Sequence, residues 1–262
     1  MLQNISADLW AAAEASADAA RVETLRHFRQ TNLVVETKSE DFDPVTAADR
    51  AAETAMRAVL ADRRPEDGIL GEEHGQVDGA SGLTWVLDPI DGTRGYVSGS
   101  PTWGVLIALS DGAGPKLGII DQPYIGERFM GGLGRAEMTG PLGTRPLAVR
   151  TTTDLADATL FTTFPEVGTL EEGAAFRRVA ERVKLVRYGC DCYAYALLAA
   201  GQIDLVIEAG LAAYDIQAPI AVIEAAGGIV TDWSGDPAHE GGRAVAAATP
   251  ELHHAALALL RG

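Results

Sequence analysis

The chain has 262 residues, 47% of them hydrophobic and 22% charged, which is typical of a globular protein. Its net charge of −16 argues against a nucleic-acid partner, because phosphate backbones attract basic surfaces. No apolar run reaches the roughly 18 residues that a membrane span requires. The start of the chain also lacks the features of a signal peptide. We therefore expect a cytoplasmic protein with no membrane partner.

The first half of the chain predicts two amphipathic helices and then a series of strands. The first helix covers residues 6–30, with Ser6 placed to cap it. Its apolar stripe is formed by Leu9, Ala13, Ala20, Leu25 and Phe28. A short extended segment and a polar turn through Pro44 lead to a second helix at residues 46–60. Strands are expected at residues 69–73, 83–87, 104–109, 116–121 and 128–131.

In the second half, strands and helices alternate. A stretch rich in Gly, Pro and Thr at residues 140–150 predicts a boundary between an N-terminal lobe, 1–145, and a C-terminal lobe, 146–262. Strands are expected at residues 159–163, 185–188, 205–208 and 229–231, and helices at 170–183, 193–200 and 216–226. This alternation favours a layered α/β architecture.

The run from Asp88 to Thr93, Asp-Pro-Ile-Asp-Gly-Thr, is the first candidate for chemistry. A buried strand delivers Asp88, and Pro89 ends that strand because it has no N–H to donate. Gly92 permits a tight backbone before Thr93, which can cap a following helix. Two carboxylates and the Ile90 carbonyl can then converge, and such hard oxygen ligands suit Mg²⁺ or Mn²⁺. Taken alone, the run is equally compatible with a simple turn.

Three further segments offer carboxylates in comparable positions. Glu72 follows an apolar strand, Asp49 stands at a helix start, and Asp215 stands where the N-cap of the helix at 216–226 would lie. A charged loop or a helix cap is the alternative for each of them. Four strand ends or helix starts that all offer carboxylates favour a shared metal site.

Together the four segments resemble the inositol monophosphatase family. They are residues 43–49, 71–73, 85–93 and 214–228, and they follow the family's order over nearly the whole chain. The resemblance implies an α/β (α+β) fold, the layered αβαβα sandwich of inositol monophosphatases and fructose-1,6-bisphosphatases. It also implies a homodimer, two or three Mg²⁺ ions with Mn²⁺ as a substitute, and a small phosphate monoester as substrate.

The same resemblance assigns roles to individual residues. It implies as metal ligands Glu72, Asp88, Asp91, Asp215 and the carbonyl of Ile90. Thr93 and Asp49 would orient or activate the attacking water, with Glu72 in the same catalytic set. The substrate would contact Asp91, Gly92, Thr93 and Asp215. The chain departs from the family pattern at Tyr214, where Trp is usual, and at Pro219, in the first turn of the helix after Asp215.

Within the family, residues 92–99, 121–129 and 187–195 resemble histidinol-phosphate phosphatases. The expected reaction is hydrolysis of L-histidinol phosphate in histidine biosynthesis. That substrate carries a cationic amine, which carboxylates can pair with, whereas inositol offers only hydroxyls. The expected substrate-binding set therefore adds Glu127, Gly189, Asp191 and Glu208. A purely structural role stays open for each of these carboxylates, and Cys190 and Cys192 are expected to be free packing thiols.

Two other functions stay open. One is an inositol-1-phosphate or broader sugar-phosphate monophosphatase of the same family. The other is a non-catalytic metal-binding protein that acts through association, and the presence of Thr93, Asp49 and all five proposed ligands counts against it. Neither cysteine has an arginine at the offset of a Cys-x5-Arg phosphatase loop, and no nucleotide-binding glycine motif is present.

Overall fold

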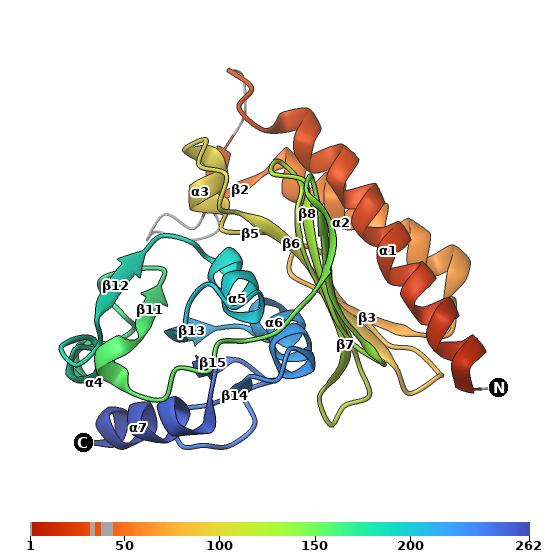
Figure 1. The fold of residues 1–262 in the computed structure, drawn as a ribbon. Helices are drawn as coiled ribbons and strands as arrows, with labels where there is room; N and C mark the ends of the chain where they lie inside the picture. Colours follow the sequence, from red (N-terminus) through yellow and green to blue (C-terminus); the bar gives the residue numbers. More distant parts are fainter. Residues whose placement is uncertain (1, 32–34, 38–43) are drawn as a thin grey trace.

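The computed structural model describes residues 2–31, 35–37 and 44–262 (Figure 1). The expected polar turn before Pro44 lies outside these residues. The elements of the first half are α1 (Leu2–His27), β1 (Val35–Thr37), β2 (Pro44–Thr46), α2 (Ala47–Arg63), β3 (Gly68–Gly71), β4 (Gly75–Val77), β5 (Thr84–Asp91), α3 (Thr93–Val97), β6 (Gly104–Ser110), β7 (Pro115–Gln122), β8 (Glu127–Gly132), β9 (Arg135–Gly140) and β10 (Gly143–Pro146). Those of the second half are η1 (Leu155–Asp157), β11 (Thr159–Thr162), α4 (Leu170–Ala180), β12 (Leu185–Tyr188), α5 (Cys192–Ala199), β13 (Leu205–Leu211), α6 (Ala213–Ala225), β14 (Ile229–Thr231), β15 (Gly242–Ala247) and α7 (Pro250–Arg261).

The chain forms two large sheets, and the first sheet ends with β10 and the second begins with β11. The first has eight strands in the order β10-β9-β8-β7-β6-β5-β3-β4, and the second has five in the order β12-β11-β13-β15-β14. Neighbours in the first sheet are antiparallel except β3 and β5, which are parallel. In the second sheet β11 runs parallel to both β12 and β13. A separate antiparallel pair joins β1 to β2.

The helices form three layers around these sheets. In Figure 1, α1 and α2 cover one face of the eight-stranded sheet, α5 and α6 fill the space between the sheets, and α4 and α7 cover the outer face of the second sheet. The result is an αβαβα sandwich, which confirms the expected fold. No helix among the described residues is both long and apolar enough to span a membrane.

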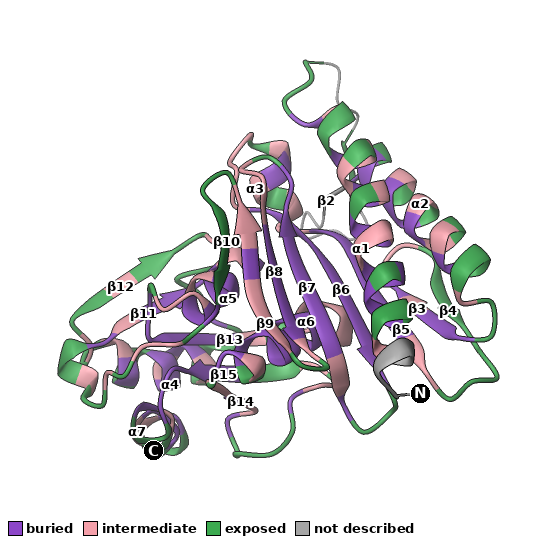
Figure 2. Ribbon diagram, turned by 45° about the vertical axis from the view of Figure 1, so that its right-hand side comes forward, coloured by how far each residue is buried: buried purple, intermediate pink, exposed green. Residues whose placement is uncertain are grey.

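Strand β6 shows how the layers are held together. Its side chains alternate in direction, as strand geometry dictates. Val105 and Ile107 pack with α1 and α2, whereas Leu106 and Ala108 pack with the middle helical layer. All seven residues of β6 are therefore buried, as the purple ribbon of the central strands in Figure 2 shows.

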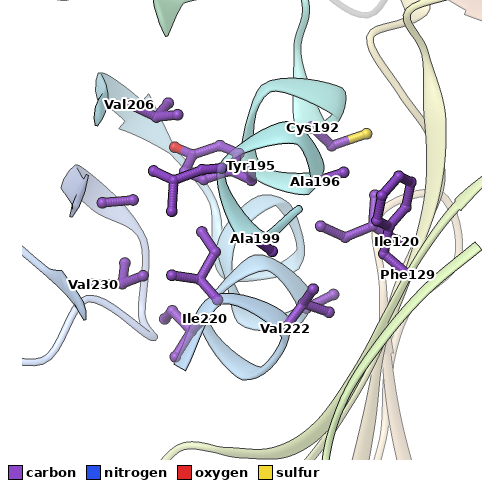
Figure 3. Close-up of a cluster of buried hydrophobic side chains, with 14 of the residues drawn as sticks. Ile120, Phe129, Cys192, Tyr195, Ala196, Ala199, Val206, Ile220, Val222 and Val230 are labelled. Carbon is purple, nitrogen blue, oxygen red and sulfur yellow. The ribbon is translucent and has the colours of Figure 1, made fainter. Parts of the chain in front are cut away.

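The middle layer is strongly apolar. Figure 3 shows Tyr195 and Ala199 of α5 and Val222 of α6 gathered with Ile120 and Phe129 of the first sheet. Helix α6 lies so close to β8 that a Cβ at Gly131 would be 2.4 Å from the Cα of Val222. Since sheets contact α6 on both sides, its sequence is mostly apolar, and its strongly polar residues are Asp215, Gln217 and Glu224.

The predicted helices and strands occur with shifted ends, and several details of the prediction are wrong. Helix α1 begins at Leu2, so Ser6 lies inside it and does not cap it. Leu25 does not join the buried stripe, because it is 39% exposed. Beyond the last predicted strand, the structure adds β15 and α7. The α7 signal was present, since Thr249 caps the helix and Pro250 occupies its first position.

Candidate active site

A cavity of about 350 Å³ opens where β5, β13 and the starts of α3, α5 and α6 meet. Among the described residues that line it, Arg94 is the single basic side chain. The acidic residues of the lining are Glu72, Asp88, Asp91, Glu166, Asp191, Glu208 and Asp215. This excess of negative charge, partly buried, calls for protons or for a bound cation.

A bulge in β5 brings Asp88 and Asp91 to the same place. Residues three apart on a regular strand point to opposite faces. Here Asp88 pairs with Leu106 and Asp91 with Gly104, so β5 contains one residue more than β6 over this stretch. The extra residue restores a common direction to the two carboxylates. The sequence predicted that the strand ends at Pro89. That prediction is wrong, because β5 continues through Pro89 to Asp91.

Asp215 reaches the same point from α6. It is the third residue of that helix and not its N-cap, which is Ala212. Its Oδ2 accepts the Ala212 N–H at 2.7 Å, and its pKa is raised to about 7, mainly by burial. Pro219 is the seventh residue of α6 and not part of its first turn. Because proline has no N–H, the helix cannot form the usual bond to the Asp215 carbonyl.

Asp88, Asp91 and Asp215 fit a hard metal ion. Each offers an oxygen within 4.8 Å of those of the other two. Burial, followed by neighbouring carboxylates, raises the pKa of Asp88 and of Asp91 well above the usual range. The charges of Glu72, Asp91 and Asp215 all act on Asp88, and like charges this close together favour protonation of one of the carboxyl groups. A divalent cation bound by these oxygens would replace such protons.

The remaining predicted ligands lie beside this cluster. Glu72 follows directly after β3 and lines the cavity, and its charge raises the pKa of Asp88 and Asp215. Ile90 lines it too, and its backbone N–H donates to Asp88 Oδ1 at 2.9 Å. The structure thus gathers all five predicted ligands around one cavity.

Thr93 and Asp49 contact each other at one side of the cavity. The Thr93 hydroxyl lies 3.0 Å from the Ile90 carbonyl and 3.5 Å from Asp49 Oδ1. Asp49 is buried at the start of α2, where its Oδ2 accepts the N–H and hydroxyl of Thr46 at 2.8 and 2.6 Å. Burial raises its pKa to about 6. Thr93 is the first residue of α3, and the cap position belongs to Gly92.

A second pair of carboxylates, Asp191 and Glu208, also lines the cavity. Glu208 accepts the Thr163 N–H at 3.0 Å and the Tyr195 hydroxyl at 2.9 Å, and its pKa is raised by burial. Burial and the Glu208 charge raise the pKa of Asp191 to about 7, whereas Arg94 opposes that rise. The Asp191 backbone has a φ of 45°, which is costly for a residue with a side chain. Strain of this kind is often found at functional sites.

Gly92 permits the approach of Asp191 to the turn after β5. Its φ is +88°, and a Cβ there would lie 2.8 Å from Asp191 Cγ. On the other side, the N–H of Cys192 donates to Asp91 Oδ2 at 2.5 Å. The backbone between Asp191 and Cys192 therefore ties the two groups of carboxylates together. Cys190 and Cys192 are free thiols, as expected.

Two predicted substrate-binding residues do not line the cavity. Glu127 lies on β8, three strands from β5, and accepts the Tyr193 hydroxyl at 2.7 Å. Gly189 follows the edge strand β12, and its N–H donates to the carbonyls of Thr162 and Thr163. Conversely, the sequence reasoning overlooked Phe164, which lies under the Arg94 guanidinium at 4.9 Å at the edge of the cavity.

Comparison with known proteins agrees with this site. The family model for the inositol monophosphatase family matches residues 6–262. The chain belongs to the inositol monophosphatase family, and it is a phosphatase. A solved inositol monophosphatase from Zymomonas mobilis has the same fold, with a TM-score of 0.85, 38% identity and 96% of each chain covered.

Two curated relatives bear on the substrate. A histidinol-phosphatase of Mycobacterium tuberculosis is 36% identical over 235 residues, 88% of this chain and 90% of that protein. The chloroplastic bifunctional phosphatase IMPL2 of Arabidopsis thaliana is 44% identical over 227 residues, 86% of this chain. The matched region spans 64% of the length of the Arabidopsis protein.

Proposed function

We propose that this phosphatase hydrolyses L-histidinol phosphate with the help of magnesium. The observation that carries the choice of substrate is the pair Asp191 and Glu208, which lines the cavity beside the metal-binding carboxylates. A phosphate ester with a cationic amine matches a cavity that has both groups of carboxylates. The histidinol-phosphatase relative supports the same choice.

Metal binding is assigned to Glu72, Asp88, Asp91, Asp215 and the Ile90 carbonyl. Their donor atoms are all oxygens, the preference of Mg²⁺, and Mn²⁺ would be accepted as a substitute. Bound there, two or three ions would neutralise phosphate charge and lower the pKa of water. An acidic cavity can therefore accept an anionic substrate, because the bound cations would lie between the carboxylates and the phosphate.

The chain's own groups supply the proton chemistry. Thr93 holds a water against the phosphate through its hydroxyl, and Asp49 accepts the proton that Thr93 passes on. The contact between Thr93 and Asp49 supports this relay. Asp49 needs to be ionised for it, which its pKa of about 6 allows at neutral pH. Backbone N–H groups at Gly92 and Thr93 would bind the phosphate oxygens.

The variant Asp191→Asn tests the substrate assignment. It keeps the shape of the side chain and removes its charge. We expect kcat/KM for L-histidinol phosphate to fall about 10- to 100-fold, the loss typical of one desolvated charge-assisted contact. We expect inositol 1-phosphate to change less than about threefold, since it carries no cation near Asp191.

Glu181→Gln is the matched control. Glu181 is exposed at the end of α4 and does not line the cavity, so the variant alters net charge equally. Equal losses for both substrates in Asp191→Asn would contradict the assignment. An inositol-1-phosphate or sugar-phosphate monophosphatase would then be favoured. The proposal also includes a homodimer in the cytoplasm, which light scattering and cell fractionation would test.

A further inference from the structure

One buried carboxylate next to the site has no place in the chemistry described so far. Glu53 of α2 is fully buried and does not line the cavity. We propose that Glu53 is a positioning residue that fixes the backbone of residues 72–74, so that the Glu72 carboxylate reaches the metal-binding cluster. The proposal rests on the metal-ligand role assigned to Glu72 above.

Glu53 accepts hydrogen bonds from the two residues after Glu72. The Glu73 N–H donates to its Oε2 at 2.6 Å, and the His74 N–H donates to its Oε1 at 3.2 Å. Hydrogen bonds to an ionised acceptor are stronger than neutral ones. The turn after β3 is thus attached to α2 at the point where Glu72 enters the cavity.

Arg57 completes the attachment. Its Nε lies 2.7 Å from Glu53 Oε1, one helical turn away, and its guanidinium also donates to the Gly75 carbonyl. The cation balances the buried charge, and a buried carboxylate needs such a partner. The carboxylate approaches β3 so closely that a Cβ at Gly71 would lie 2.1 Å from Glu53 Oε1. Only glycine fits at position 71 without moving Glu53.

The position of Glu53 on α2 gives these contacts a catalytic consequence. Glu53 lies four residues after Asp49, so both face the same side of α2. One rigid helix therefore holds Asp49 against Thr93 at its start and the Glu72 turn one helical turn later. This arrangement fixes the distance between the Thr93–Asp49 pair, which would hold the water, and Glu72, which would bind the metal.

Magnesium binding by Glu53→Gln tests the proposal. The amide keeps the volume, but one of its two ends can no longer accept a backbone N–H. We expect the Mg²⁺ dissociation constant, measured by calorimetry on the purified protein, to rise about 10- to 100-fold, as for other residues that orient a metal ligand. We expect kcat at saturating Mg²⁺ to recover to within about threefold of wild type, because the ligands themselves remain.

Two further variants separate positioning from simple loss of stability. Gly71→Ala displaces the Glu53 carboxylate without altering its chemistry and should weaken Mg²⁺ binding in the same way. Asp67→Asn is the control, because Asp67 also forms a buried ion pair with an arginine, Arg64, but lies away from the cavity. We expect Asp67→Asn to lower the melting temperature and to leave Mg²⁺ affinity unchanged. Glu53→Asp, which keeps both acceptor oxygens, should restore part of the affinity.

The outcomes distinguish this inference from the proposed function. Wild-type Mg²⁺ affinity in Glu53→Gln, together with weakened affinity in Glu72→Gln, would overturn the inference and leave the proposed function intact. Wild-type affinity in Glu72→Gln itself would overturn the metal role of Glu72 and the inference with it. Equal weakening in Asp67→Asn and Glu53→Gln would also overturn the positioning role.

Discussion

At the scale of single residues, the contact between Thr93 and Asp49 makes a sharp prediction. Replacing either group removes one member of a proton relay, and such relays contribute about 10²- to 10⁴-fold to rate. We expect Thr93→Ala and Asp49→Asn each to lower kcat by that order, measured by phosphate release at saturating Mg²⁺. Because the two act as a unit, the double variant should be no slower than the slower single variant.

The metal dependence of these variants is the control. Thr93 is not among the proposed ligands, so Thr93→Ala should keep the wild-type Mg²⁺ dissociation constant. If the losses of the two single variants multiplied in the double variant, Thr93 and Asp49 would act independently, and the relay would be wrong.

The residues that reach the cavity were predictable where their chemistry follows directly from a strand end or helix start. Asp91 at the end of β5 and Asp215 in the first turn of α6 are of this kind, and the structure places them with Asp88 within reach of one ion. Glu53 was overlooked because a carboxylate in the middle of a helix gives no local signal of a partner. Its spacing from Asp49, one turn on the same buried face, was the clue available. Glu127 was expected near the substrate, but the order of strands places β8 about 14 Å from β5.

At the scale of elements, the junction between β5 and α3 depends on Gly92. An alanine there must adopt a left-handed backbone, which costs about 1–2 kcal/mol, and its Cβ would push Asp191 away. We expect Gly92→Ala to lower the free energy of unfolding by at least that amount, measured by urea denaturation. We also expect a loss of turnover, because the displaced Asp191 adjoins Asp91 through Cys192.

Gly82→Ala is the matched control for this junction. Gly82 has a φ of +80°, and a Cβ there would contact nothing within 4 Å. Gly82→Ala should lower the free energy of unfolding only by the cost of the left-handed backbone, and its turnover should equal that of wild type. A Gly92→Ala variant that behaved like Gly82→Ala would show that the close approach of Asp191 has no importance.

The elements also show where sequence patterns stop being informative. The apolar runs predict β5 and β6, because a strand buried on both faces is apolar throughout. The bulge that turns Asp88 and Asp91 toward one point depends on how β5 pairs with β6, and no local pattern states that register. Likewise, the Ala-rich strand β15 has only one β-branched residue, Val245, and is defined by its neighbours β13 and β14.

At the scale of the whole molecule, the acidic cavity links stability to pH. The pKa values of Asp191 and Asp215 are about 7 in the folded protein and near 3.8 when exposed. Between these values the folded chain binds more protons than the unfolded chain, so stability falls as pH rises through 7. We expect the metal-free protein to melt at a lower temperature at pH 8 than at pH 6.

Magnesium should reverse this trend, because it binds the ionised carboxylates of the folded state alone. The increase in melting temperature on adding Mg²⁺ should therefore be larger at pH 8 than at pH 6, as measured by differential scanning calorimetry. An equal increase at both pH values would mean that the cavity carboxylates do not titrate in this range.

The central claim joins a metal-dependent phosphatase site to a cavity that accepts a cationic substrate. Its most direct test is kcat/KM of the wild-type protein for L-histidinol phosphate and for inositol 1-phosphate at saturating Mg²⁺, measured side by side. The account predicts at least about a 100-fold preference for L-histidinol phosphate, the equivalent of about 2.7 kcal/mol, and no turnover of either ester after chelation. Equal turnover of the two esters, or faster turnover of inositol 1-phosphate, would contradict it.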